Sequence, residues 1–182
     1  MTARPNLFLM VGLPGTGKTT EARRIEVEDG ALRLTKDEWV KALYGQANPA
    51  SATAVIEGRL ISVALRALDL GVDVVLDFGL WSRDERTALR QAAETVGADA
   101  HLRYCALDAD EQRRRIDRRH ADEPHTTWHM SDDELARWSV AFDVPTPREL
   151  DGSGPLDEPP AGFATWDTWR TSRWPSSVDP GA

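Results

Sequence analysis

The stretch GLPGTGKT, residues 12–19, restricts the possible folds of this chain more than any other feature. It matches the pattern G-x-x-x-x-G-K-[S/T] in full, with an apolar run at residues 7–11 before it and the run TTEARRIEVE after it. Glycines let consecutive backbone N–H groups curl around an anion, and a following helix adds its positive N-terminal end. The pattern therefore predicts a strand, a phosphate-binding loop and a helix.

Individual residues of this loop have distinct predicted roles. Lys18 should reach the β- and γ-phosphates of a nucleoside triphosphate, and the Thr19 hydroxyl should ligate Mg²⁺. The alternative is a glycine-rich turn without a ligand, which the complete motif in this context disfavours. We expect ATP and Mg²⁺, with the preference over GTP left open. The predicted nucleotide-binding residues are Gly12, Pro14, Gly15, Thr16, Gly17, Lys18, Thr19 and Thr20.

Length, charge and cysteine content limit the class of protein. The 182 residues suit one domain, 1–182. A net charge of −8 argues against nucleic acid as a partner, because no broad basic face is available. Cys105 is the single cysteine, so an internal disulfide is impossible. Its apolar sequence context predicts a small buried hydrophobic residue. Without a run of 18 apolar residues or a signal-peptide pattern, we expect a cytoplasmic protein with no membrane partner, either monomer or homodimer.

Short apolar runs alternate with helical patterns along the chain. Four runs are typical of buried strands, at residues 7–11, 31–34, 72–77 and 101–107. Two amphipathic runs predict helices, at residues 53–70 and 82–96, each followed by a glycine that can cap it. The capping box S/T-x-x-E predicts helix starts at Thr35, Ser82 and Ser131. Alternating strands and helices predict an α/β fold with a parallel sheet between helices.

The composition changes in the C-terminal segment, residues 143–182. Its first part is rich in proline, glycine and acidic residues and predicts a long loop. The last twenty residues contain Trp166, Trp169 and Trp174, which is too aromatic for a free tail. We expect FATWDTW, residues 163–169, to pack on the body of the protein, with a strand as one option, and the final eight residues to be loose.

The fate of the γ-phosphate depends on what else lies near the loop. A guanine-reading N-K-x-D motif is absent, and a mechanical ATPase usually has a longer chain, so a small kinase is favoured. Such an enzyme needs a base for the acceptor hydroxyl. Asp37 lies just beyond the second predicted strand, and the carboxyl ends of strands hold ligands in such sheets. If Glu38 belongs to the capping box, Asp37 is free to act as that base; the alternative is an acid that only favours the helix dipole.

A second acid ends the apolar run VDVVLD. Asp77 is predicted to hold Mg²⁺ through water or to orient the acceptor, against the simpler interpretation of a solvated strand-end acid. Phe78 and Trp81 follow it closely and become candidate acceptor contacts, as does Trp39 beside the predicted base. Aromatic residues at such positions are also frequent core residues, so both interpretations stay open.

Five arginines follow the fourth predicted strand. Arg115 and Arg119 are four residues apart and share one helical face, from which a lid can close over the transferring phosphoryl group. The other three, Arg113, Arg114 and Arg118, are interpreted as solvated. The predicted lid covers residues 109–130. Its histidines, His120, His125 and His129, do not have a standard zinc spacing, so we interpret them as a lid tip, with a substrate contact left open.

Together these motifs resemble the small P-loop kinases of the predicted ATP-binding kinase group, which is similar to polynucleotide 5′-kinase, gluconate kinase and chloramphenicol phosphotransferase. The resemblance covers residues 7–150. It implies a five-stranded parallel sheet of order 2-3-1-4-5, ATP with Mg²⁺, Asp37 as the catalytic base, and Arg115 and Arg119 as lid arginines. It also implies that FDVPTP, residues 142–147, passes near the adenine.

One departure bears on the acceptor. Polynucleotide kinases of this group typically carry an arginine three residues after the catalytic acid, and Val40 stands there, preceded by Trp39. An apolar pocket fits a small molecule, an antibiotic or metabolite, better than a nucleic-acid end. Two alternatives stay open: a 5′-hydroxyl polynucleotide kinase, and a nucleotide-binding regulator that hydrolyses ATP without a small-molecule acceptor.

Overall fold

A computed structural model of the protein describes residues 3–45, 49–123, 127, 129–153 and 155–178. Its centre is a sheet of four parallel strands in the order β2-β3-β1-β4. The strands are β1 (Asn6–Val11), β2 (Leu32–Leu34), β3 (Val74–Gly79) and β4 (Asp99–Tyr104). All four lie on predicted strands, with ends displaced by up to three residues. The predicted α/β class and the strand order 2-3-1-4 are confirmed.

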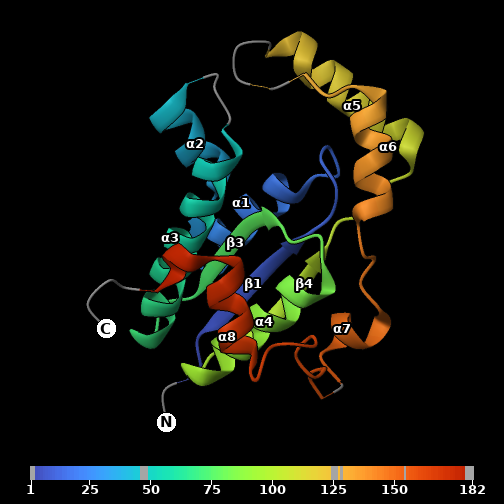
Figure 1. Cartoon of the computed structure of the whole chain (residues 1–182). Coiled ribbons are helices and arrows are strands. Elements are labelled where there is room, and N and C mark those ends of the chain that lie inside the picture. Colours follow the sequence, from blue (N-terminus) through green and yellow to red (C-terminus); the bar gives the residue numbers. More distant parts are fainter. Residues whose placement is uncertain (1–2, 46–48, 124–126, 128, 154, 179–182) are drawn as a thin grey trace.

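Helices cover both faces of the sheet (Figure 1). They are α1 (Lys18–Glu28), α2 (Lys36–Tyr44), α3 (Ala50–Asp69), α4 (Arg83–Thr95), α5 (Ala109–Asp122), α6 (Asp132–Ala141), α7 (Pro147–Asp151) and α8 (Trp166–Arg173). Alternate side chains of β1 enter two separate cores. Leu7 and Leu9 join the core with α3 and α4, and Phe8 and Met10 join the core with α1. This two-sided burial explains the continuous apolar run of the central strand.

The predicted fifth strand is absent among the described residues. After α6 the chain carries prolines at positions 145, 147, 155, 159 and 160. Proline has no backbone N–H to donate to a sheet ladder, so this stretch runs as loop around the short helix α7. The strand option for FATWDTW is also wrong, because Trp166 begins α8, capped by the Thr165 side chain.

The final eight residues were predicted to be loose, and the structure describes the first four of them, 175–178, which lie against α3. A 3₁₀ turn, η1 (Pro175–Ser177), follows α8 and packs on α3. A Cβ on Gly58 of α3 would lie 2.2 Å from Ser176 Oγ, so only glycine permits this approach. Ser176 also donates to the carbonyl of Val55 at 2.8 Å. Trp174 is 1% exposed and belongs to the main core. The prediction that the tryptophans pack back on the protein is therefore confirmed.

The three predicted capping boxes have different outcomes. Ser82 and Ser131 each accept from the backbone N–H three residues later, and both boxes are complete. Thr35 precedes α2 but makes no side-chain cap, because its hydroxyl accepts a hydrogen bond from Arg33. Glu38 also pairs with Arg33, at 2.7 Å. The capping box at Thr35 is therefore wrong, although α2 begins where it was predicted.

Candidate active site

The loop between β1 and α1 has the backbone of a phosphate cradle. Gly12, Gly15 and Gly17 all have positive φ, at 145°, 79° and 97°. A Cβ on Gly12 would lie 2.6 Å from the Cys105 carbonyl oxygen, and one on Gly15 would lie 2.8 Å from Ile116 Cγ1. Glycine is required at both positions by conformation and by space. The loop therefore sits tightly between the end of β4 and α5, with its helix N-terminus at Lys18.

Lys18 is the buried cation of this loop. Its Nζ donates to the carbonyl of Leu13 at 2.8 Å, which folds the side chain back over the loop. Burial lowers the pKa of the Lys18 ammonium, and the negative charges of Asp77 and, more weakly, Asp37 offset part of that effect. Both predicted acids therefore lie within electrostatic range of the lysine. An anionic ligand in the cradle would favour the charged ammonium further.

Asp77 lies on β3 at the carboxyl edge of the sheet and is 6% exposed. Burial raises the pKa of its carboxyl group, and hydrogen bonding by Thr19 and the charge of Lys18 counteract this only in part. Its Oδ2 atom is buried without a hydrogen-bond partner, and Arg33 Nη1 is 3.8 Å away. Asp77 is therefore not a solvated strand-end acid. A buried oxygen without a donor beside a threonine hydroxyl fits a Mg²⁺ site, since this ion takes few protein ligands together with water and phosphate oxygens.

Asp37 is in the first turn of α2 and is exposed. Its charge raises the pKa of Lys18 and of Asp77, so the carboxylate lies within electrostatic range of both groups. The structure thus brings the predicted base, the phosphate-loop lysine and the predicted metal ligand to one edge of the sheet. Glu38 was predicted to form a capping box and forms an ion pair with Arg33 instead. In either arrangement Glu38 is occupied, and Asp37 is available for the predicted role of base. Thr20, by contrast, is exposed on α1.

Helix α5, the centre of the predicted lid, packs directly on the phosphate loop. Gln112 Nε2 donates to the carbonyl of Pro14 at 2.7 Å, and Ile116 contacts Gly15. Arg115 is the arginine nearest the cradle: its Nη1 is 3.9 Å from the position of a Cβ on Gly17. Arg119 is exposed one turn further along the helix. Figure 1 shows α5 and α6 on one side of the carboxyl edge of the sheet and α2 on the other.

Three of the other lid residues have structural partners. Arg113, predicted to be solvated, pairs with Asp117 and Asp132 and donates to the carbonyl of Met130, which joins α5 to the start of α6. The rings of His120 and His129 are 5.5 Å apart, edge to face. His125 lies outside the described residues. In the described ranges no group of three or more His, Cys, Asp or Glu side chains is arranged to hold a metal ion.

A first cavity, which we call the nucleotide cavity, opens beside the phosphate loop and has a volume of about 190 Å³. Its lining comes from the loop, from the residues after β4, and from the end of α6. Phe142 and Val144 are part of it, and the Phe142 ring stacks on Tyr104 at a centroid distance of 6.0 Å. The largely apolar lining of this space next to the phosphate loop suits a purine base. The segment 142–147, which the resemblance implies to pass near the adenine, therefore contributes its first residues to the lining of this cavity.

A second cavity, the acceptor cavity, has a volume of about 180 Å³. It is lined by Lys36, Glu57, Phe78, Leu80, Trp81, Glu85, Arg173 and Trp174. Lys36 precedes the predicted base, and Phe78 follows the predicted metal ligand near the carboxyl end of β3. Phe78 and Trp81 were predicted as acceptor contacts. Trp39, the third candidate, is 50% exposed and lies outside the cavity lining.

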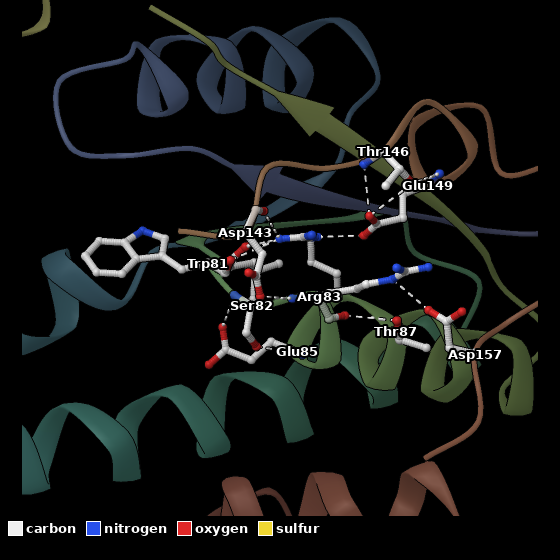
Figure 2. A network of polar contacts seen from close by, with 11 residues as sticks. Trp81, Ser82, Arg83, Glu85, Thr87, Asp143, Thr146, Glu149 and Asp157 are labelled. Carbon is white, nitrogen blue, oxygen red and sulfur yellow. Dashed lines mark hydrogen bonds and ion pairs between the residues drawn. The ribbon is translucent and has the colours of Figure 1, made fainter. Parts of the chain in front are cut away.

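One buried guanidinium, that of Arg86 in α4, connects the walls of the two cavities. It donates to Glu149 at 2.9 Å and to the carbonyls of Trp81 at 3.1 Å and Asp143 at 2.9 Å. Figure 2 shows Asp143, Thr146 and Glu149 converging on the start of α4, with the Trp81 indole pointing away from this network. Trp81 lines the acceptor cavity, and Asp143 lies between two residues of the nucleotide cavity.

Sequence reasoning missed the charged residues of the acceptor cavity and the role of Arg86. A signal existed for two of them. Glu57 lies between Ile56 and Leu60 in the apolar part of α3, and Arg86 is three residues before the buried Leu89 of α4. A charged residue among core positions of an amphipathic helix indicates a buried partner. The pairing itself crosses long sequence distances and has no local pattern.

The fold and this site define a P-loop nucleotide-binding protein of the small-kinase type. The sequence profile of a family described as an AAA domain matches residues 7–145, and the chain belongs to that family. No curated protein matches the chain. Among the described residues, no helix is both long and apolar enough to cross a membrane.

Solved structures show the same fold at low sequence identity. A candidate kinase from Chloroflexus aurantiacus superposes with a TM-score of 0.65 and 20% identity, covering 93% of this chain and 97% of that one. The APS kinase CysC of Mycobacterium tuberculosis, in complex with AMPPNP and APS, gives a TM-score of 0.55 and 20% identity, with 93% and 95% covered. A chain of the Pnkp1/Rnl/Hen1 RNA repair complex gives 0.62 and 18%, covering 86% of this chain and 48% of its own length.

Proposed function

We propose that the protein is an ATP-dependent phosphotransferase that moves the γ-phosphate of ATP to a hydroxyl group of a small molecule. The observation that carries this proposal is the placement of Lys18 at the start of α1, Asp77 near the end of β3 and Asp37 at the start of α2, all at one edge of the sheet. The charges of Asp77 and Asp37 raise the pKa of Lys18 against the effect of its burial, which supports this placement. A cavity that suits a base and a second cavity for an acceptor adjoin that edge. A slow regulatory ATPase has no need for the second cavity or for a carboxylate beside it.

Each residue has a role in the proposed transfer. Asp37 accepts the proton of the acceptor hydroxyl as its oxygen bonds to the γ-phosphorus. Lys18 and the loop N–H groups stabilise the charge that moves to ADP when the bond to the bridging oxygen breaks. Arg115 and Arg119 of α5 would stabilise the charge on the transferring group, for which Arg115 has to leave its ion pair with Glu111. In this proposal Asp37 takes the proton, the arginines of α5 stabilise the phosphoryl group, and Lys18 stabilises the leaving ADP.

Mg²⁺ would be held by the Thr19 hydroxyl and the Asp77 carboxylate, the buried oxygen of which has no donor. When bound, the ion would neutralise phosphate charge. The raised pKa of Asp77 means that the site binds a cation in competition with a proton. Removing Asp77 should therefore weaken the magnesium dependence of ATP binding as well as turnover.

The proposal is tested by ADP release from MgATP with a panel of acceptors: hydroxylated antibiotics, sugars, nucleosides and 5′-hydroxyl oligonucleotides. Wild type is compared with Asp37→Asn and with Asp84→Asn, which changes an acid at the equivalent second position of α4. Loss of a general base costs about 10²–10⁴ in rate. We expect that loss for Asp37→Asn with the active acceptor and little change for Asp84→Asn.

Other outcomes assign the protein differently. If only oligonucleotides are phosphorylated, the protein is a 5′-hydroxyl polynucleotide kinase. If ATP is hydrolysed at one slow rate with every acceptor, and Asp37→Asn keeps that rate, the chain is a nucleotide-binding regulator and Asp37 is merely a first-turn acid.

A further inference from the structure

Two ion pairs line the acceptor cavity. Lys36 Nζ is 2.7 Å from Glu57 Oε1, and Arg173 Nη2 is 2.7 Å from Glu85 Oε1. Arg173 also lies 3.7 Å from Glu57 Oε2, which links the two pairs into one network. Two cations and two carboxylates therefore face the cavity, and their charges balance.

The other lining residues of the cavity are apolar or aromatic. Phe78, Leu80 and Trp174 are each less than 10% exposed. Trp81 is half-buried, and its ring centroid lies 5.8 Å from that of Trp138. The Trp174 N–H is already bonded to Glu57 Oε2 at 3.1 Å, so its ring is fixed. The lining thus combines hydrocarbon and aromatic surface with paired charges, and the two kinds of surface adjoin where the Arg173 guanidinium lies over the Trp174 ring, 5.0 Å from its centroid.

We propose that this cavity selects a compact, uncharged acceptor with several hydroxyl groups on a hydrocarbon ring or chain. The inference rests on the phosphotransfer proposed above. A hydroxyl both donates and accepts, so it can bridge a cation and a carboxylate without separating them. A charged acceptor has to take one partner of an ion pair and leave the other without compensation, which costs most where the carboxylate of Glu57, with a side chain 11% exposed, loses its partner. The apolar lining then receives the C–H face of the ligand.

The volume of the cavity and the chain segments that line it limit the acceptor further. A volume of about 180 Å³ is below the roughly 300–1,000 Å³ of pockets for drug-sized ligands, which favours a compact acceptor over large antibiotics and nucleic-acid strands. Arg173 and Trp174 lie beyond residue 145, where the family match ends. The selectivity assigned here therefore comes from the C-terminal segment, which is docked on α3 through Gly58 and Ser176.

The test uses the full chain with MgATP and three sets of small probes. Glucose, ribose and myo-inositol are neutral, gluconate and glucose 6-phosphate are anionic, and glucosamine is cationic. ADP release reports transfer, and saturation-transfer NMR with AMPPNP reports binding without turnover. We expect the neutral set alone to bind and to accelerate ADP release. Arg173→Met should raise the KM of the best neutral acceptor about tenfold or more, beyond any change in the KM for ATP.

Arg83→Met is the matched control, because Arg83 forms an ion pair of the same length with Asp157 but does not line the cavity. It should leave the acceptor KM unchanged. Preference for anionic or cationic probes, or equal effects of the two arginine variants, overturns this inference while phosphotransfer stands. Failure to bind any neutral probe by NMR overturns it even if no turnover is found. Failure to bind AMPPNP overturns the proposed function instead.

Discussion

Replacing Arg86 with methionine should destabilise the protein by about 3–5 kcal/mol. The side chain is 0% exposed and pairs with Glu149, which is itself 6% exposed. Methionine is of similar length but leaves the Glu149 carboxylate buried with only the Thr146 donors. Breaking a buried ion pair by removing one partner costs about 3–5 kcal/mol. For a chain of this size, about 2–4 °C per kcal/mol gives a fall in melting temperature of roughly 6–20 °C.

The pH dependence supplies a second test of the same variant. Burial alone would raise the pKa of Glu149, but hydrogen bonds from Arg86 and Thr146 lower it below its usual value. In wild type the stability from Glu149 is therefore present above its ordinary pKa and is lost as pH falls through the folded pKa. Without Arg86 only the Thr146 hydrogen bonds oppose the effect of burial, so the pKa of Glu149 rises and protonation relieves the buried charge. The deficit of Arg86→Met should therefore shrink as pH falls from 7 toward 5.

Urea unfolding at both pH values measures these quantities. The double variant Arg86→Met, Glu149→Gln should recover much of the loss, with a coupling energy of about 2 kcal/mol or more. Arg83→Met removes an exposed ion pair, with both partners 48% exposed, and should cost less than about 1 kcal/mol. The reasoning is refuted if Arg86→Met costs under about 1 kcal/mol, or if its deficit is the same at both pH values.

Two further predictions concern other parts of the site. Because burial raises the pKa of Asp77, the ionised carboxylate opposes folding once the pH exceeds the ordinary pKa of an aspartate. Asp77→Asn should therefore be more stable than wild type in urea at pH 7, and the difference should disappear as the pH falls below about 3.8. Magnesium-dependent ATP binding should be lost in the same variant. Gly58→Ala places a methyl group 2.2 Å from Ser176 Oγ and should destabilise by about 1–3 kcal/mol, with faster proteolysis after α8 and a higher acceptor KM; unchanged proteolysis and KM contradict the assigned role of the C-terminal segment.

The parts predicted best are those with a local physical signature. The phosphate loop needs glycine at Gly12 and Gly15 because neighbouring backbone and side chains leave no room for a Cβ, and that need is visible in the sequence. Buried strands are visible as apolar runs, and Ser82 and Ser131 mark helix starts because capping involves residues three apart. Such features form the frame that places Lys18 at the sheet edge.

The parts missed depend on contacts between distant residues. Thr35 matches the capping box, yet Arg33 takes its hydroxyl and Glu38, because a guanidinium competes successfully with a backbone N–H. The resemblance implied a fifth strand that the prolines after α6 prevent. The acceptor cavity depends on Arg173 meeting Glu85 across 88 positions, which no period or motif records.

The turn at Leu80 shows how such a contact shapes the site. Leu80 has φ of 39°, a left-handed conformation that costs a non-glycine residue about 1–3 kcal/mol. Its side chain is 4% exposed in the main core, and Arg86 binds its carbonyl at 3.3 Å, so two constraints hold the turn. The turn directs Trp81 toward the acceptor cavity, while the same guanidinium binds Asp143 beside the nucleotide cavity. One buried charge in α4 thus joins the walls of the two cavities and holds Trp81 and Asp143 at a fixed spacing.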